Sequence, residues 1–410
     1  MFDLLFVYSQ NENNLINFKE NFSFRKYNAF YNNISGREII LSGQNYYLYG
    51  LTRESEDKCI FENEKIIIAI VGYLEKKGNL DSDEEKEINA KFIYESIKSG
   101  ININNIIKGN YAIIIFDKEI NSIRLINSRF GISPIYYMQE ANDFYMCTSL
   151  HILKKIKGSF YIDEVAILER EIFNYPLGEK TLIKNVYVLQ PSEELQIKRN
   201  EIKSELHFKF ESLYDSEILN EKESLKKGKN LFYNVVNSKI RDKNKVCVSL
   251  TGGFDGRTIL SVLNHKKEDL LLYSFGIENS LNMNIPNQIS HELGYRYLPI
   301  ILEKDYERVY TEYAKQIVIQ SDCLRTIEGA NYPYAFQILS RFSDTVITGI
   351  FGSELLRTFQ NIGTMISEEF ALLNKENNGK KAWENIKKLL INKSYLNKNI
   401  IEEYFQDAKE

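Results

Sequence analysis

Short apolar runs separated by polar breaks fill the chain up to about residue 205. Runs of this length are typical of buried strands, so the pattern predicts stacked sheets with helices on their outer faces. The charged segment 83–99 is expected to form an exposed helix. The polar stretch 198–222 is the predicted connection to a second region.

The second half of the chain changes to longer units in which a strand is followed by a helix. A helix is predicted near 222–236, and apolar strands and helices then alternate, which is the pattern of a parallel sheet. Beyond Thr358 the sequence predicts helices, for example 382–391 and 399–405, whose charged residues are most simply solvated faces. We therefore expect two domains, 1–205 and 222–410.

One strand-turn-helix segment carries the most chemical information. Val246 to Leu250 is a short apolar run of the kind that a parallel sheet buries, and 258–263 has the apolar spacing of a helix. Between them, Gly252 and Gly253 let the backbone approach an anion, and the helix start supplies unpaired N–H groups. Arg257 in the first helical turn opposes the helix dipole by about 0.3–1 kcal/mol unless an anion lies between them. The pattern predicts a phosphate site.

An ordinary strand-turn-helix, in which the glycines serve only the turn, explains Gly252 and Gly253 equally well. The segment also lacks the Gly-Lys-Ser/Thr ending of a P-loop and the G-x-G-x-x-G spacing of a dinucleotide fold. Both interpretations stay open on these residues alone.

The segment resembles the Ser-Gly-Gly-x-Asp-Ser pyrophosphate loop of the asparagine synthetase family, which are ATP pyrophosphatases that form an acyl-adenylate. Thr251 stands for the first Ser, Asp255 and the two glycines match, and Gly256 replaces the last Ser. In the family this Asp holds the magnesium that bridges the phosphates, so the resemblance gives that role to Asp255. A hard cation bound to phosphate needs only one or two protein carboxylates. The nucleotide-binding residues that the resemblance implies here are Ser249, Thr251, Gly252, Gly253, Asp255, Gly256, Arg257 and Thr258.

Later segments follow the order of the same family. Leu270 to Gly276 is a second apolar strand, and it ends in the Ser-Phe-Gly that family members place beside the adenine. Residues 289–294 resemble the helix and Leu-Gly turn that come next, and 345–356 resemble the family's strand and Gly-Glu-Gly-Ser-Asp-Glu-Leu loop. The resemblance therefore adds Ser274, Phe275, Gly276, Gly352 and Ser353 to the nucleotide site.

The last of these loops can be aligned in two ways. With one inserted residue, Gly352-Ser353-Glu354 overlays Gly-Ser-Asp, and Glu354 becomes the second magnesium carboxylate. Without the insertion, Ser353 takes that place and one ligand is lost. We favour the first alignment because an anionic ligand does more for the metal than a hydroxyl. Asp255 and Glu354 are then the predicted metal ligands.

The first half carries a separate resemblance, to the glutamine amidotransferase domain that precedes the synthetase domain in this family. Residues 108–117 and 124–137 match it closely and in order, and 178–191 resemble its last strand. Each alone is an ordinary hairpin, but their shared order with the pyrophosphate loop favours the family. The resemblance implies an α/β protein, with an Ntn-type αββα sandwich over 1–205 and a parallel-sheet PP-loop domain over 222–410.

The glutaminase chemistry of such a domain is not evident in the sequence. An enzyme of this kind uses the side chain of the residue at the mature N-terminus, normally Cys, with its own amine as the base. This sequence begins Met1-Phe2-Asp3, and the strand that should carry an oxyanion-binding Asn-Gly reads Val71-Gly72. Cys59 would become terminal only by cleavage through the core of the domain. We therefore expect a glutaminase-inactive domain.

Composition excludes some function classes. A formal net charge of −4 gives no electrostatic reason to expect a nucleic-acid partner. The four cysteines are scattered without metal spacing and fit a reducing compartment, and the four histidines are isolated in the sequence. The apolar runs are too short to span a membrane. We expect a cytoplasmic protein without a nucleic-acid or membrane partner.

Together these features predict a ligase that uses ATP and Mg²⁺ to adenylate a small-molecule or peptide carboxylate and then form an amide. The amine would be free ammonia or an amine of the substrate, as in the family relatives without the terminal Cys, the β-lactam synthetases and lasso-peptide cyclases. About fifty residues follow the second metal loop, and no equivalent of the family's catalytic lysine is recognisable among them. A fragment, a short member with altered chemistry and a non-catalytic nucleotide-binding or scaffolding homologue stay open, as does a homodimer.

Overall fold

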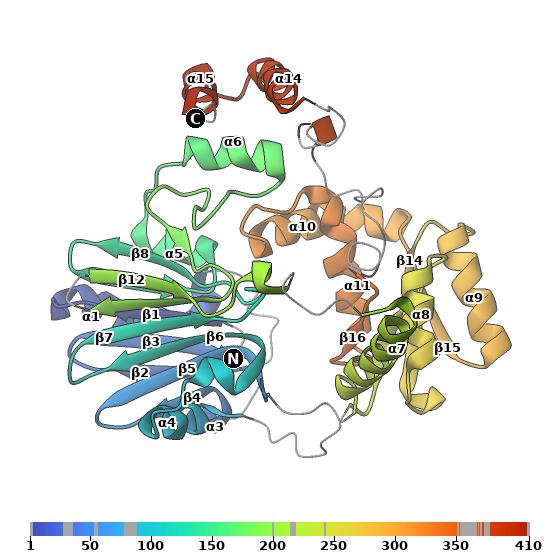
Figure 1. Cartoon of the computed structure of the whole chain (residues 1–410), viewed down its shortest axis with the longest axis horizontal. Helices are drawn as coiled ribbons and strands as arrows, with labels where there is room; N and C mark the ends of the chain where they lie inside the picture. The colour runs from blue at the N-terminus through green and yellow to red at the C-terminus, as the bar shows by residue number, and fades with distance from the viewer. Residues whose placement is uncertain are drawn as a thin grey trace. The chain divides into compact units, whose positions relative to one another are not determined.

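The computed structural model of the chain describes residues 3–27, 36–52, 56–77, 88–198, 201–213, 219–241, 243–350, 352, 367, 369, 371–372 and 378–407. The chain divides into two compact units (Figure 1). The first unit comprises Met1–Ser216 together with Ile366–Glu410, and the second comprises Glu217–Met365.

Two six-stranded antiparallel sheets lie face to face in the first unit (Figure 1). The strand order is β10-β8-β9-β1-β3-β2 in one sheet and β12-β11-β7-β6-β5-β4 in the other. The strands are β1 (Asp3–Tyr8), β2 (Arg37–Ser42), β3 (Tyr46–Thr52), β4 (Ile60–Glu62), β5 (Ile66–Lys76), β6 (Ile107–Asp117), β7 (Ser122–Asn127), β8 (Tyr136–Glu140), β9 (Asp143–Cys147), β10 (Tyr187–Val188), β11 (Glu193–Lys198) and β12 (Glu201–Leu206).

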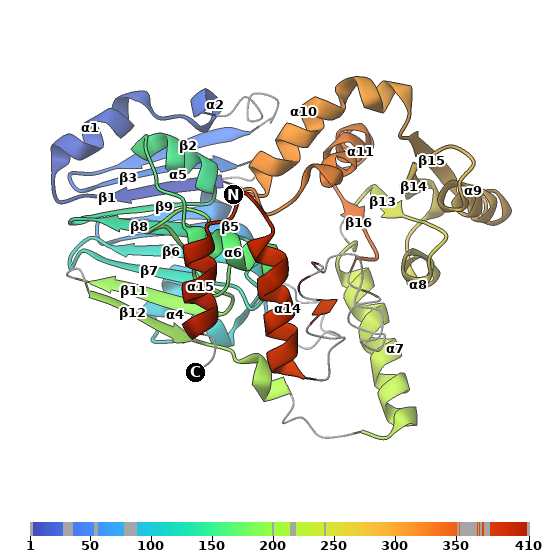
Figure 2. The ribbon, with the colours of Figure 1, turned by 90° about the horizontal axis from the view of Figure 1, so that it is seen from above.

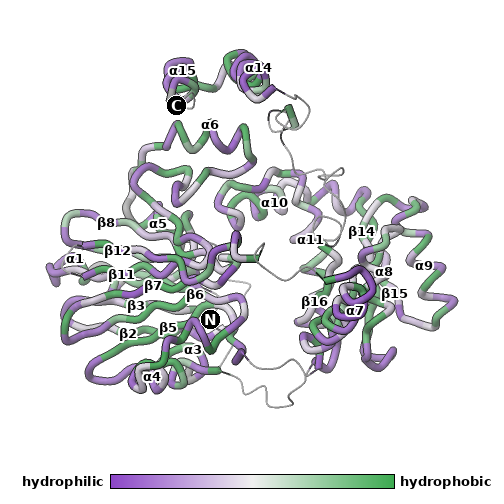
Figure 3. Tube along the Cα trace, viewed as in Figure 1, coloured by the Kyte–Doolittle hydropathy of each residue, from purple (hydrophilic) through white to green (hydrophobic). Residues whose placement is uncertain are grey.

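Strand β1 illustrates why these sheets form. Leu4, Phe6 and Tyr8 enter the core between the sheets, whereas Leu5 and Val7 lie on the outer face. Successive side chains of a strand point to opposite faces, so a strand that is covered on both sides is apolar at consecutive positions. β5 and β6 follow the same rule, and both strands are largely green in Figure 3.

Helices cover both outer faces of the sheets. Apolar residues of α1 (Glu12–Asn21), α2 (Phe24–Tyr27) and α5 (Leu150–Lys157) pack on the sheet that contains β1. α4 (Ala90–Lys98) packs on the outer face of the other sheet, and the short α3 (Glu56–Cys59) leads into β4. The first unit is therefore an αββα sandwich, as the resemblance implied.

The C-terminal segment of the chain packs on the first unit. α14 (Gly379–Ile391) and α15 (Lys398–Asp407) lie side by side (Figure 2) and form a small core with α6 (Glu164–Phe173). The buried residues of this core come from all three helices and the turn before α15: Leu168, Ile172, Ile386, Leu390, Leu396, Ile401 and Phe405.

Charged residues fix this contact. Lys393 Nζ lies 2.7 Å from Glu171 Oε2 and 2.9 Å from Oε1 of the buried Glu369. The Tyr395 hydroxyl donates to Glu171 Oε2 at 2.6 Å. Burial raises the pKa of Glu171, but the hydrogen bonds from Lys393 and Tyr395 outweigh this effect and hold the pKa below its ordinary value. The packing of 366–410 on the first unit differs from the range 222–410 expected from the sequence, and the assignment of functional domains stays a prediction.

The second unit contains a parallel four-stranded sheet in the order β15-β14-β13-β16. Apolar clusters lie on both of its faces, as buried parallel sheets require. Its elements are α7 (Glu221–Ser238), β13 (Val246–Ser249), α8 (Phe254–Val262), β14 (Leu270–Gly276), α9 (Leu281–Leu293), β15 (Arg296–Ile301), α10 (Lys304–Gln320), α11 (Asn331–Leu339) and β16 (Val346–Ile347). The fold class is α/β, as expected.

Three local expectations differ from the structure. The helix expected at 83–99 is observed as Ala90–Lys98, and 83–87 lie outside the described residues. The strand expected within 178–191 is shorter in the structure: β10 covers Tyr187–Val188, and Lys180 and Ile183 form isolated bridges, because the Thr181 side chain holds this segment in a local turn. The polar residues 201–206, expected to be part of a connection, pair with β11 as the edge strand β12. None of the helices in the described ranges has the length and apolar character needed to cross a membrane.

Candidate functional site

The predicted phosphate loop connects β13 to α8. Gly253 is the N-cap of α8, and because glycine has no side chain, this residue makes no side-chain cap hydrogen bond to the first turn. The backbone N–H of Gly253 donates to Thr251 Oγ1 at 3.1 Å, which tightens the turn before the helix. A helix start of this kind is suited to an anion.

Gly256 explains the difference from the family motif, which has Ser at this position. A Cβ on Gly256 would lie 2.6 Å from the carbonyl oxygen of Ser249. The first turn of α8 therefore lies directly against the end of β13, and only glycine fits without moving the helix. Here Gly256 preserves the close approach of helix and strand.

A second loop reaches Asp255 from the neighbouring strand. β16 pairs with β13 in parallel, and the turn after it contains Gly349 and Gly352. A Cβ on Gly349 would lie 2.8 Å from Asp255 Cβ, and one on Gly352 would lie 3.1 Å from Asp255 Cγ. The loops at the carboxyl ends of these strands thus meet at Asp255, the edge at which open parallel sheets bind ligands.

Two predicted residues of this second loop, Ser353 and Glu354, lie outside the described residues. The position of Gly352 beside Asp255 is compatible with either alignment of the loop, and the choice between Glu354 and Ser353 as the second metal ligand stays a prediction. Within the described ranges, no group of three or more His, Cys, Asp and Glu residues is arranged to hold a metal ion.

Arg257 turns back on its own loop. Its Nε donates to Gly253 O and its Nη2 to Gly252 O, both at 3.0 Å, and the guanidinium lies 4.5 Å from the ring centroid of Phe254. The sequence suggested that an anion would relieve the conflict between this cation and the helix dipole. The carbonyl oxygens of the two glycines already relieve part of it, so Arg257 by itself is a weaker sign of bound phosphate than expected.

The residues expected beside the adenine end β14. Ser274 is buried, and its hydroxyl hydrogen-bonds with Tyr297 and lies 3.4 Å from Met283 Sδ. Phe275 contacts the ring of Tyr332 edge-on at a centroid distance of 5.5 Å. The side chain of Ser274 thus supports the strand, and the carbonyl of Gly276 accepts a hydrogen bond from the N–H of Leu302 at 2.9 Å.

Hydroxyl groups of the remaining predicted residues also bind the protein itself. Thr258 Oγ1 donates to Phe254 O at 2.9 Å within α8. Burial raises the pKa of Tyr273 to about 12, and a hydrogen bond with Ser249 opposes the rise. The structure therefore brings Ser249, Thr258 and the phosphate loop together at one edge of the sheet, with their side chains engaged locally.

The middle of β5 in the first unit, at Val71 and Gly72, is the counterpart of a glutaminase site. Val71 is 4% exposed and belongs to the core between the sheets. Gly72 has a φ of +83°, and a Cβ there would collide with the carbonyl oxygen of Asn110 and lie 2.8 Å from Ser133 Oγ. Cys59 is buried and lies 3.3 Å from Thr52 Oγ1. The glycine with positive φ is present within the strand, but the side chain that precedes it is apolar and cannot donate a hydrogen bond.

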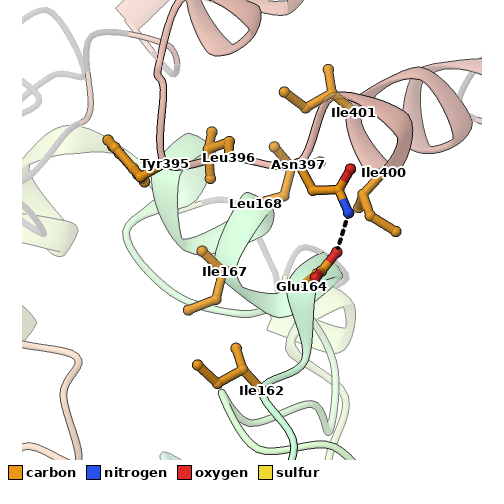
Figure 4. Close-up of a pocket in the computed structure, with 9 residues that line it drawn as sticks. All are labelled: Ile162, Glu164, Ile167, Leu168, Tyr395, Leu396, Asn397, Ile400 and Ile401. Atoms are coloured by element: carbon orange, nitrogen blue, oxygen red, sulfur yellow. Dashed lines mark hydrogen bonds between the residues drawn. The ribbon is translucent and has the colours of Figure 1, made fainter.

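A separate cavity of about 280 Å³ lies between α6 and α15 (Figure 4). Its wall is mostly aliphatic, and Asn397 donates to Glu164 at its edge. It contains none of the predicted site residues, so it is not part of the candidate site.

Two contributors to the site were not identified from the sequence. Gly349 and Tyr332 touch Asp255 and Phe275, respectively. The sequence offered a signal for Gly349, because this residue is the first glycine of the resembled loop. It offered no signal for Tyr332, because the contact of Tyr332 with Phe275 depends on how α11 packs on the sheet.

Comparison with known proteins supports the two resemblances. Residues 74–209 match the family model of the glutamine amidotransferase domain. A provisionally named asparagine synthetase (glutamine-hydrolyzing) 2 of Methanocaldococcus jannaschii is 25% identical over 240 residues, 54% of this chain and 46% of that protein. Asparagine synthetase (glutamine-hydrolyzing) 1 of Bacillus subtilis is 25% identical over 235 residues, 56% of this chain and 36% of that protein. The chain is asparagine-synthetase-like.

The matched part of this asparagine-synthetase-like chain spans less than half the length of these relatives. Among solved structures, glutamine phosphoribosylpyrophosphate amidotransferase from B. subtilis is similar with a TM-score of 0.32 and 13% identity, over 72% of this chain and 65% of that chain. The NH3-dependent NAD synthetase from Campylobacter jejuni has a TM-score of 0.25 and 16% identity, over 42% and 75%. These structural similarities are too distant to carry an argument.

Proposed function

We propose that the second unit binds ATP with Mg²⁺, adenylates a carboxylate and lets an amine form an amide. The observation that carries the proposal is the meeting of two loops at Asp255. The phosphate loop and the Gly349–Gly352 turn come from separate parts of the resembled motif, yet their glycines pack against the same carboxylate. A motif shared by chance would give no reason for this contact.

The residues present suit the magnesium that the resemblance implies. Asp255 would hold the ion, and Glu354 is the proposed second ligand. One or two carboxylates are enough for an ion that also binds phosphate oxygens. When bound, the ion would neutralise phosphate charge. The protein would contribute backbone N–H groups at the start of α8, which would bind and orient phosphate oxygens.

We propose that glutamine is not the nitrogen source, so that the amine is free ammonia or part of the substrate. Val71 supports this, because a buried aliphatic side chain cannot stabilise an oxyanion. The first two residues of the chain lie outside the described residues. A cytoplasmic location also remains a proposal, for which the scattered cysteines are the support.

A non-catalytic nucleotide-binding protein is the second candidate. Ile350 favours it, because the motif that this turn resembles has Glu after its first glycine. Such a protein would bind ATP without turning it over. Exchange of labelled pyrophosphate into ATP, which requires reversible adenylation, separates the two candidates.

Binding of ATP and Mg²⁺ is the first experiment. A ligand that binds only the native state stabilises it by about 2.7 kcal/mol at a hundredfold excess over Kd. We expect a corresponding thermal shift for the wild-type protein and its loss in Asp255→Asn, which removes the charge but keeps the side-chain shape. Asp269→Asn, in the turn before β14, is the matched control and should keep the shift. The absence of any shift with millimolar ATP and Mg²⁺ would overturn the proposal.

A further inference from the structure

Large exposed apolar side chains gather around the candidate site. Phe254 is 65% exposed, Ile277 67%, Leu281 74% and Ile350 56%. They follow the carboxyl ends of β13, β14 and β16, where ligands of open parallel sheets bind. Neighbouring exposed apolar groups on a soluble protein mark a binding surface.

Contacts between the loops bring the segments that carry these side chains together. A Cβ on Gly252 would lie 3.2 Å from Ile285 Cδ1 and 3.5 Å from Leu281 O, so the start of α9 touches the phosphate loop. Ile350 belongs to the turn whose two glycines lie against Asp255. Segments with exposed apolar side chains therefore pack on the phosphate loop from two directions.

Aromatic rings extend this apolar surface along α11. Tyr332, at the start of the helix, contacts Phe275 edge-on, and it lies 6.2 Å from the ring of Phe336. Phe336 is itself 39% exposed. Ring edges and faces of this kind suit an aliphatic chain or another ring.

Among the described residues of these loops, 250–258, 277–281, 348–350 and 352, Arg257 is the one cation, and this does not suit an acidic amino acid. Such a substrate needs a cation for its second carboxylate and an acceptor for its ammonium group. The Arg257 guanidinium is bound to the carbonyl oxygens of Gly252 and Gly253. Ile350 occupies the position at which the resembled motif carries an acid.

From these contacts we infer that the carboxylate activated by the second unit has an apolar, aliphatic or aromatic body. This inference rests on the proposed ATP-dependent activation and adds the substrate class. In the reaction, a carboxylate oxygen forms a bond to the α-phosphorus of ATP while the bond from that phosphorus to the bridging oxygen breaks and pyrophosphate leaves with the electron pair. Returning pyrophosphate reverses the step and re-forms ATP.

The test is exchange of labelled pyrophosphate into ATP by the full chain. Octanoate and 3-phenylpropionate serve as apolar acids, and L-aspartate and L-glutamate as acidic amino acids, at equal concentrations. We expect at least about tenfold faster exchange with one of the apolar acids, because desolvation of an apolar body favours its binding to this surface. ATP binding is measured separately by thermal shift.

Substitutions at individual positions test which apolar side chains bind the acid. Ile350→Ala removes exposed apolar surface beside Asp255 and should raise the KM for the apolar acid about tenfold while the KM for ATP changes less than twofold. Ile350→Leu should restore most of the affinity for the acid. Leu225→Ala is the matched control, because Leu225 is also exposed, at 67%, but lies on α7. Phe336→Ala, which removes the exposed ring further along α11, is a second test with the same expectation.

The outcomes separate this inference from the proposed function. Faster exchange with aspartate or glutamate would overturn the substrate class and leave the ligase proposal intact. A rise in the KM for ATP, and not for the acid, in both Ile350→Ala and Phe336→Ala would also overturn the substrate class. ATP binding without exchange for any of the four acids would also overturn the substrate class. A lack of ATP binding would overturn the proposed function itself.

Discussion

Two crowded glycines, one in each unit, follow the same structural rule but differ in the chemistry beside them. Gly72 ends the apolar part of β5 and Gly256 opens α8, and in both places a Cβ would collide with a backbone carbonyl oxygen. Beside Gly72 stands Val71, which belongs to the core between the sheets. Beside Gly256 stands Asp255, a partly exposed carboxylate at a sheet edge where two loops meet.

The difference indicates that backbone geometry and side-chain chemistry can separate during divergence. A crowded glycine holds a fold together whether or not a reaction takes place, so its presence does not establish activity. The side chain next to it is set by its own surroundings, which are the core between the sheets for Val71 and a sheet edge for Asp255. The first unit therefore has the shape of a glutamine amidotransferase domain without the amide donor, whereas the second has both the turn and the carboxylate.

Substitution of Gly72 should have the largest effect on stability. In Gly72→Ala the Cβ meets the Asn110 carbonyl in a backbone conformation with positive φ, and we expect a loss of about 2–4 kcal/mol. Gly100→Ala is the control, because Gly100 has a φ of +72° but no atom within 4 Å of its Cβ. Urea denaturation measures the free energy of unfolding of both variants. Equal losses in the two variants would mean that crowding at Gly72 is unimportant.

Restoring an amide beside Gly72 should not restore a glutaminase. Val71→Asn puts a polar side chain into the core between the sheets, and an unsatisfied buried group costs about 1–3 kcal/mol. We expect a lower urea midpoint and no release of glutamate from glutamine, as in the wild-type protein. Val71→Ala is the control, because it leaves a cavity in the core without adding a polar group, and so separates these two effects on stability. Glutamate formation by the wild type or by Val71→Asn would contradict the view that the first unit has lost this chemistry.

Substitution of Gly256 should act on binding more than on stability. Gly256→Ala pushes the start of α8 away from Ser249, and we expect at least about tenfold weaker ATP–Mg²⁺ binding, equal to about 1.4 kcal/mol. Gly228→Ala is the matched control in α7, where a Cβ has open space and should stabilise the helix by about 0.5–1 kcal/mol. Isothermal titration gives both affinities. Unchanged affinity in Gly256→Ala would mean that crowding at Gly256 plays no part in ATP binding.

The smallest predicted effect concerns pH and the contact between α6 and the C-terminal helices. The lowered pKa of Glu171 contributes stability above its ordinary value of 4.5, and this is lost as the pH falls through the lowered pKa. Burial lowers the pKa of Lys393, but its two carboxylate partners raise it overall, so its contribution is present below 10.5 and is lost as the pH rises through the raised pKa.

Hydrogen exchange of α14 and α15 should therefore be slowest between about pH 4.5 and 10.5 after correction for the intrinsic exchange rate. Lys393→Met should destabilise this contact by about 1 kcal/mol or more, because it leaves two partly buried carboxylates without their cation. Lys387→Met, which breaks a more exposed pair with Glu402, is the control and should change little. Protection that does not depend on pH would show that apolar packing alone holds these helices.

Local patterns predicted much of the fold. The strand Leu270–Gly276 was predicted with its observed bounds, and the Leu-Gly turn ends α9 with Gly294 in the left-handed conformation that glycine permits. In these cases apolar runs and turn residues that are close in sequence carry the information. The approach of the Gly349–Gly352 turn to Asp255 was predictable only through the motif, since about ninety residues separate the two loops.

Long-range packing accounts for what the sequence did not reveal. The association of Ile386 and Phe405 with α6 depends on apolar faces that would fit many partners, and nothing in the local pattern selects α6. Arg257 was assigned to phosphate on charge alone, whereas its donors reach two carbonyl groups of its own loop. The choice between Ser353 and Glu354 as metal ligand lies outside the described residues.

The return of residues 366–407 to the first unit makes the second unit an insertion within the first. The chain crosses between the units twice, near residue 216 and near residue 365. A single cut at either crossing should leave two fragments that stay together under native conditions, because after either cut the C-terminal helices still bind α6 through their apolar contact and through Lys393. The first unit is thus assembled from the two ends of the chain, and its folding is completed only after the second unit has been synthesised.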